Sequence, residues 1–206
     1  MGIAFGVALV LAAIVLVIEG TDAKALVDAL RLTARWSFVL FWLAYAGGSL
    51  AALFARALAP LAWRGRDFGL AFAAAHLVHL GLVVWIFRIS STPPISVEAF
   101  YFFSIAMVWT YLLALFSFGS LAQTLGTWAW RAFRLLGMNY ILYAFAVDFV
   151  PAALGRGAHS YGLSRLVEYA PFGALCVAAP LLVLVAAAQR QLRIRYRRAG
   201  LGLVVN

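Results

Sequence analysis

The chain has 206 residues, of which 66% are apolar and only 11% are charged, and its mean hydropathy is +0.99. A soluble domain is about half apolar and a quarter charged, so this composition excludes a soluble globular protein, a disordered chain and a nucleic-acid-binding domain. The formal net charge of +9 comes mostly from Arg residues that lie between apolar runs, where basic residues mark membrane topology.

About 20 mostly apolar residues are needed to cross the hydrocarbon core of a bilayer as a helix, and six stretches of the chain reach or approach that length. These stretches are residues 2–18, 36–54, 68–87, 99–121, 132–150 and 169–188. No connection between them is long enough to form another domain. We therefore expect an all-α polytopic membrane protein in which residues 1–206 form one transmembrane domain, a bundle of six helices.

Local signals mark helix boundaries and helix contacts. The pair Pro93-Pro94 ends the third stretch, because proline cannot continue a helix, and Ser96 is a suitable N-cap for the fourth. Small residues let membrane helices approach closely. We expect such contacts at Gly47, Gly48 and Ser49 in the second stretch, and at Gly119 and Ser120 in the fourth.

Basic residues near the helix ends predict the orientation, because Lys and Arg accumulate on the cytoplasmic side. With six spans both termini share a side, and that side carries ten basic residues against six on the other. Both termini are therefore expected in the cytoplasm. The Arg-rich tail from Arg190 to Arg198 is interpreted as a stop signal that contacts anionic headgroups. We expect the protein in the inner (plasma) membrane of a bacterium, in contact with the lipid bilayer.

The third stretch contains two histidines, His76 and His79. At 1.5 Å per residue they lie roughly 13–18 Å from the cytoplasmic end of the helix, near mid-membrane, and a spacing of three places them on one helical face. Ionisable groups at this depth are costly and usually functional. Ala73 to Ala75 and Gly81 leave room on that face. Two interpretations stay open: ligands for a porphyrin iron, or interhelical hydrogen-bonding groups.

The fifth stretch contains the other unusual polar groups. Met138 and Asn139 are expected near the depth of His76, whereas Asp148 lies nearer the outer surface and is interpreted as interfacial. The third histidine, His159, lies in a Gly-rich outer connection and is interpreted as a surface residue. The single cysteine permits neither an intrachain disulfide nor a cysteine-based zinc site, and no phosphate loop, dinucleotide motif or HExxH pattern is present.

Three segments resemble the ferric-reductase-like transmembrane family, and within it the haem-binding membrane subunits of periplasmic methionine sulfoxide reductase systems. They are Leu32-Thr-Ala-Arg-Trp36, Arg64-Gly-Arg-Asp-Phe-Gly-Leu70 and Leu125-Gly-Thr-Trp-Ala-Trp-Arg131, the second followed by His79 ten residues after its last glycine. The resemblance covers residues 30–150. It implies a b-type haem with His79 as a ligand of the iron.

The sequence departs from that family in the fifth stretch. Phe133-Arg134 stands where the family has a Leu-His pair, and Asp148 or Phe149 stands where it has a later histidine. His76 and His79 point the same way from one helix, so they cannot bind opposite faces of one haem. Three alternatives follow. Met138 is the second axial ligand, the haem is shared across a homodimer or with another subunit, or the haem has been lost.

The leading hypothesis is a membrane electron-transfer subunit with a b-type haem at His79 or His76. Without a flavin or nicotinamide domain, it would receive electrons from quinol or a separate reductase and pass them to a periplasmic partner, so it is at most the membrane subunit of an oxidoreductase system. An alternative is a haem-free accessory subunit of a larger membrane complex. A third is a small proton-coupled transporter that uses His76, His79 and Asp148.

Overall fold

The computed structural model describes residues 1–118, 126–156 and 163–198, and these residues form helices without any strand. The long helices are α1 (Gly2–Glu19), α2 (Ala23–Phe54), α4 (Gly65–Ile89), α5 (Val97–Ser117), α7 (Thr127–Ala153) and α8 (Leu163–Arg198). A 3-10 turn η1 (Ala55–Leu58) and the short helix α3 (Ala59–Trp63) connect α2 to α4. The protein is therefore all-α, and six helices of the described chain are long and apolar enough to span a membrane.

The expected helix count is confirmed, but the helix bounds differ from those expected. The second stretch was expected to begin at residue 36, whereas α2 begins at Ala23 and contains Lys24, Asp28, Arg31 and Arg35. Charged residues are accommodated in this helix because hydrogen bonds and ion pairs stabilise its first half. Asp22 accepts a hydrogen bond from the backbone N–H of Ala25 across 2.8 Å, which caps the first turn.

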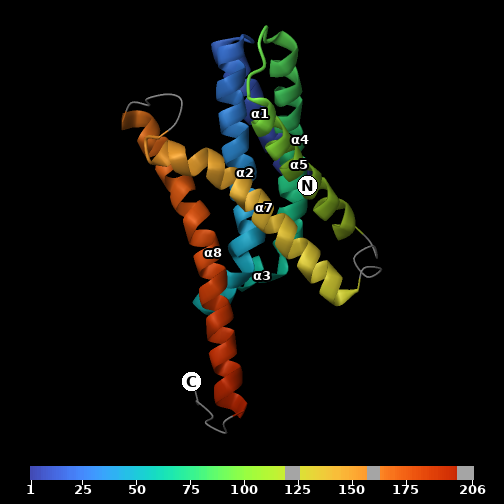
Figure 1. Ribbon diagram of the computed structural model, residues 1–206, viewed down its shortest axis with the longest axis vertical. Helices are drawn as coiled ribbons and strands as arrows, with labels where there is room; N and C mark the ends of the chain where they lie inside the picture. The colour runs from blue at the N-terminus through green and yellow to red at the C-terminus, as the bar shows by residue number, and fades with distance from the viewer. Residues whose placement is uncertain (119–125, 157–162, 199–206) are drawn as a thin grey trace.

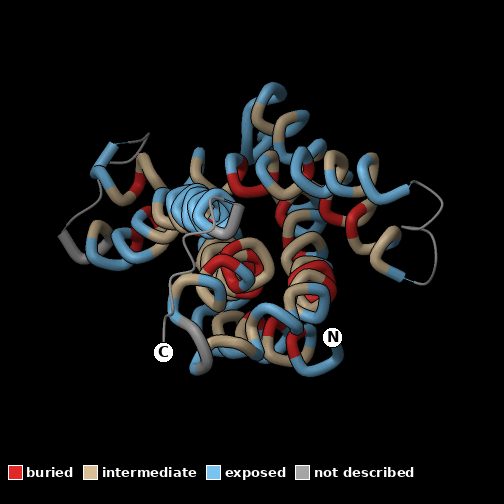
Figure 2. Tube along the Cα trace, turned by 90° about the horizontal axis from the view of Figure 1, so that it is seen from below, coloured by how far each residue is buried: buried red, intermediate tan, exposed pale blue. Residues whose placement is uncertain are grey.

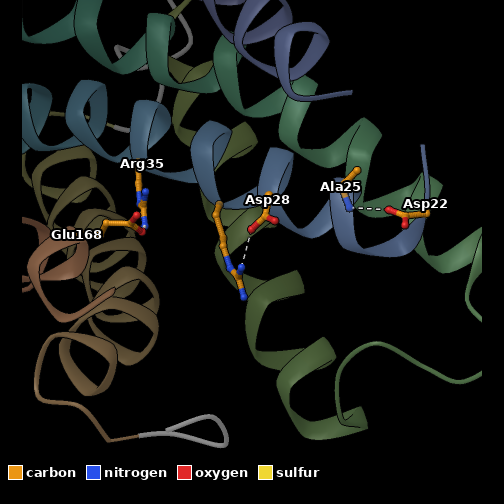
Figure 3. Close-up of polar contacts among 6 residues, drawn as sticks. Asp22, Ala25, Asp28, Arg35 and Glu168 are labelled. Atoms are coloured by element: carbon orange, nitrogen blue, oxygen red, sulfur yellow. Dashed lines mark hydrogen bonds and ion pairs between the residues drawn. The ribbon is translucent and has the colours of Figure 1, made fainter. Parts of the chain in front are cut away.

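Two ion pairs further stabilise the charged half of α2 (Figure 3). Asp28 pairs with Arg31 within the helix across 2.6 Å. Arg35 reaches Glu168 of α8 across 3.0 Å, and its guanidinium also lies 4.7 Å from the centre of the Tyr169 ring. Helix α8 is likewise longer than expected at both ends, because the Arg-rich tail continues the helix to Arg198.

The helices α2 and α4 form the centre of the bundle, with α1 packed against both, while α7 crosses at a steep angle and packs on α5 and α8 (Figure 1). Aromatic rings join these parts. Phe38 of α2 contacts Phe145 and Phe149 of α7, each with ring centres 5.1 Å apart, and Phe72 of α4 contacts Phe145 at 6.1 Å. The rings that join α7 to the centre therefore include Phe38, Phe72, Phe145 and Phe149.

The outward faces of the long helices are exposed and apolar, whereas the buried residues line the inner faces (Figure 2). Ile3 on α1, Val108 on α5 and Leu184 on α8 are 86%, 52% and 64% exposed. Water would penalise such surfaces, but hydrocarbon does not. The protein is thus a multi-pass membrane protein that contacts the lipid bilayer.

The expected close helix contact is found at Gly47, where an added Cβ would lie 3.4 Å from Leu61 of the short helix α3, but not at Gly48, which has open space beside it. The tightest contacts are at Gly137, where an added Cβ would lie 2.7 Å from the Trp109 ring of α5, and at Gly173, where it would lie 2.7 Å from Ala153 of α7. The expected contacts at residues 119 and 120 lie outside the described residues.

The start of α5 agrees with the local signals. The hydroxyl of Ser96 accepts a hydrogen bond from the backbone N–H of Ala99 across 3.2 Å, which confirms Ser96 as the N-cap. Glu98 lies in the first turn, where a negative charge interacts favourably with the helix dipole. The helix was expected to run to residue 121, but it ends at Ser117.

Candidate functional site

The two histidines of α4 lie against each other inside the bundle. Their rings are nearly parallel, with an interplanar angle of 18° and ring centres 5.2 Å apart. Helix periodicity explains this geometry, because residues three apart lie on neighbouring turns of one face. The structure therefore brings His76 and His79 together as the sequence predicts, and it confirms that both rings leave the helix on the same side.

Thr33 of α2 holds the ring of His79. Its hydroxyl oxygen lies 3.1 Å from Nδ1 of His79, and its single proton is already donated to the backbone carbonyl of Ala29 at 2.9 Å, with that of Leu30 at 3.1 Å. A hydroxyl has one proton and two lone pairs, so at this contact the oxygen accepts and Nδ1–H donates. We assign the proton to Nδ1 of His79, which leaves the lone pair on Nε2.

His76 lies in an aromatic environment with incomplete hydrogen bonding. Its ring centre is 5.6 Å from that of Phe72 and 6.4 Å from that of Tyr111 on α5. Within the described residues, Nδ1 of His76 and the hydroxyl of Tyr111 are both buried without a hydrogen-bond partner. Buried polar groups normally have partners, so these two unpaired atoms are sites where a water or a ligand would be stabilised.

The second feature is a cavity of about 890 Å³, which we call the arginine-rimmed cavity. Its arginines are Arg66, Arg131, Arg134 and Arg190. They come from α4, α7 and α8, where α4 and α7 begin and α8 approaches its end. All four side chains are exposed, and no Asp or Glu lines the cavity.

The interior of the arginine-rimmed cavity is mostly apolar. Phe41, Phe72, Leu113 and Ile141 contribute to its wall, together with Met138. Two polar residues of the lining form a hydrogen bond between helices: the hydroxyl of Tyr45 on α2 donates to Oδ1 of Asn139 on α7 across 2.9 Å.

The candidate residues of the sequence analysis thus fall into two places. His76 and His79 lie in the cluster with Thr33 and Tyr111, whereas Met138 lines the arginine-rimmed cavity, which neither histidine lines. Phe72 is shared, since it packs against His76 and lines the cavity.

Two further residues named in the sequence analysis lie elsewhere in the chain. Asp148 is exposed near the end of α7. His159 lies outside the described residues.

Thr33 and Tyr111 were missed by sequence reasoning. Thr33 stands inside one of the segments that carry the family resemblance, but nothing in the sequence shows that it meets a residue 46 positions away. Tyr111 sits in an aromatic run of α5 and gives no separate signal. The arginine-rimmed cavity was also missed, because its walls come from six separate helices.

Among the candidate ligands that the structure describes, His79 has the hydrogen-bonding arrangement of an axial ligand of a haem iron. His79 presents Nε2 with a lone pair and has its other ring nitrogen held by Thr33, which is the arrangement that ligating histidines commonly show. His76 leaves the helix on the same side, and Met138 belongs to the other place. Among the described residues, no group of three or more His, Cys, Asp or Glu residues is placed to hold a metal ion.

Comparison with protein-family models, with curated proteins and with solved structures finds no match to this chain.

Proposed function

We propose that the chain is an integral membrane electron-transfer subunit that holds one b-type haem through His79. The observation that carries this proposal is the 3.1 Å contact between Nδ1 of His79 and the hydroxyl of Thr33, in which we assign Nδ1 as the donor. It selects the tautomer in which Nε2 is free to bind iron, and it fixes the direction of the ring. An imidazole placed at the expected mid-membrane depth is costly to desolvate, and ionisable groups at that depth are usually functional.

Each residue of the cluster has a role in this proposal. Thr33 is a positioning residue, because it orients His79 without contact to iron. His76 stacks on His79 and restricts its rotation, while Phe72 and Tyr111 enclose the pair. A bound haem supplies a one-electron carrier whose potential depends on its ligands and on the polarity around it.

The proposal assigns one axial ligand of the haem iron to this chain. Because Met138 lines the arginine-rimmed cavity and the histidines do not, Met138 is not used as the second ligand. The second axial position is therefore open or is filled by a second subunit, either another copy of this chain or a membrane partner. Electrons would arrive from quinol or a separate reductase and leave to a periplasmic protein.

The test is the absorbance spectrum of the full chain purified from haem-replete cells. We expect a Soret band that His79→Ala abolishes or strongly shifts, and that His76→Ala changes less. Thr33→Val should shift the band or weaken haem retention without removing the ligand. Met138→Leu is the matched control and should leave the spectrum unchanged. A wild-type protein without a Soret band would contradict the proposal.

A haem-free accessory subunit is the second candidate, and one observation favours it. The bond between Thr33 and His79 joins α2 to α4, so it ties two spans together without any cofactor. In that case His79→Ala would cost only about 0.6–2 kcal/mol of bundle stability, the range of interhelical hydrogen bonds in membranes. The same spectrum decides between the two candidates.

A further inference from the structure

We propose that the arginine-rimmed cavity is a binding site for an anionic phospholipid, with the phosphate at the arginines and an acyl chain inside. This site is separate from the histidine cluster, so the inference does not depend on haem binding.

The rim provides the charge. Arg131 and Arg134 come from the first turns of α7, Arg66 from the start of α4 and Arg190 from α8. Within the described part of the chain none of them forms an ion pair, since the two pairs found there use Arg31 and Arg35. Guanidinium groups match the oxygens of a phosphate in a bidentate geometry. Clustered arginines in a lining that contains no Asp or Glu therefore favour a phosphate over an uncharged headgroup.

The interior provides the apolar part of the site. Behind the rim lie Phe41, Phe72 and Leu113, and the cavity volume of about 890 Å³ lies within the range of small-molecule sites. Gly48 lines this space and has no atom within 4 Å of where a Cβ would be. An inorganic ion would leave this chamber unused, whereas an acyl chain would fill it.

The depth of the site fits a lipid. Trp63 and Trp130 also line the cavity, and tryptophan accumulates at the level of the headgroups. Trp63 is 85% exposed at the end of α3, so the rim lies where a phosphate of the bilayer would lie. Basic pockets between membrane helices are known sites for anionic headgroups. A neutral quinone head would meet the same arginines without any charge to pair.

Native mass spectrometry of the delipidated full chain tests this site. The probes are phosphatidylglycerol, phosphatidylcholine with the same chains, and inorganic phosphate. We expect one phosphatidylglycerol to bind at least about fivefold more tightly than phosphatidylcholine, with no competition from inorganic phosphate at millimolar concentration. Equal binding of the two lipids, or displacement by phosphate alone, would overturn the proposal.

Two pairs of variants locate the binding. Arg131→Gln combined with Arg134→Gln should weaken phosphatidylglycerol binding about 25-fold, or about fivefold for each arginine, whereas Arg88→Gln at the other end of α4 should not. Gly48→Leu should fill the chamber and weaken binding, whereas Gly81→Leu, on an exposed face of the same bundle, should not. Unchanged binding in both cavity variants would overturn the proposal.

The absorbance spectrum of each variant separates this inference from the proposed function. Loss of the Soret band in the double arginine variant, with lipid binding unchanged, would assign the cavity to haem and overturn the lipid site. A wild-type protein without haem that still binds phosphatidylglycerol selectively would refute the electron-transfer proposal and support the lipid site.

Discussion

Thr33 and His79 lie on different helices and 46 residues apart, yet their side chains meet at a distance of 3.1 Å inside the bundle. Thr33 is fully buried, so its oxygen has no access to solvent as an alternative partner. The contact joins α2 to α4, and with Nδ1–H assigned as its donor it also sets the tautomer of the imidazole. The packing of the two central helices and the chemistry of the histidine are therefore coupled.

Thr33→Val should destabilise the bundle by about 0.6–2 kcal/mol, because it removes the interhelical hydrogen bond between Thr33 and His79. The measurement is unfolding in mixed micelles. Thr110→Val is the matched control, since the hydroxyl of Thr110 is also buried but donates only to the carbonyl of Ala106 in its own helix. Equal losses in the two variants would show that the interhelical bond contributes nothing.

Replacing glycine by alanine should lower the stability of the protein at some sites and leave it unchanged or raise it at another. Gly173→Ala and Gly137→Ala should each cost about 1–3 kcal/mol, because the new Cβ would lie 2.7 Å from a neighbouring helix. Gly48→Ala should instead be neutral or stabilise by up to about 1 kcal/mol, because the space is open and alanine favours a helix. Melting temperatures in detergent measure this. Destabilisation by Gly48→Ala would contradict the observed packing.

Replacing Arg35 should reduce the stability of the protein more than removing its ion-pair partner Glu168 does. Glu168→Gln removes the charge of a half-exposed partner and should cost less than about 1 kcal/mol. Arg35→Ala also removes the guanidinium from the Tyr169 and Phe172 rings at 4.7 and 5.6 Å, which adds about 0.5–1 kcal/mol. Thermal unfolding of both variants at low and high salt compares them. Equal losses of stability in the two variants would show that the contacts of Arg35 with the two aromatic rings contribute nothing to stability.

A reporter fused after Asn206 should be active only in the cytoplasm, because ten of the 16 basic residues are expected on the side of the termini. The measurement uses paired reporters, one active in the cytoplasm and one active in the periplasm. A fusion in the connection between α4 and α5, at Thr92, is the control and should show the reverse. A periplasmic C-terminus would overturn the orientation or the number of spans.

Composition and hydropathy were sufficient to predict the all-α class and the six spans, because the bilayer imposes a length and an apolar surface on each helix separately. The position of Ser96 and the shared face of His76 and His79 followed from local geometry. Helix ends were less predictable. Charged residues such as Arg35 continue a helix when a residue far away in the chain provides a partner, and Glu168 is such a residue.

The tertiary structure alone decided which side chains meet. Thr33 reaches His79, and Met138 lines the arginine-rimmed cavity. Close helix contacts fall at Gly137 and Gly173 because the crossing of α7 over its neighbours sets where backbones approach. Such crossings depend on side-chain shapes from several helices at once. Periodicity in one segment gives the face that a residue occupies, and only the packed bundle gives the partner on the other side.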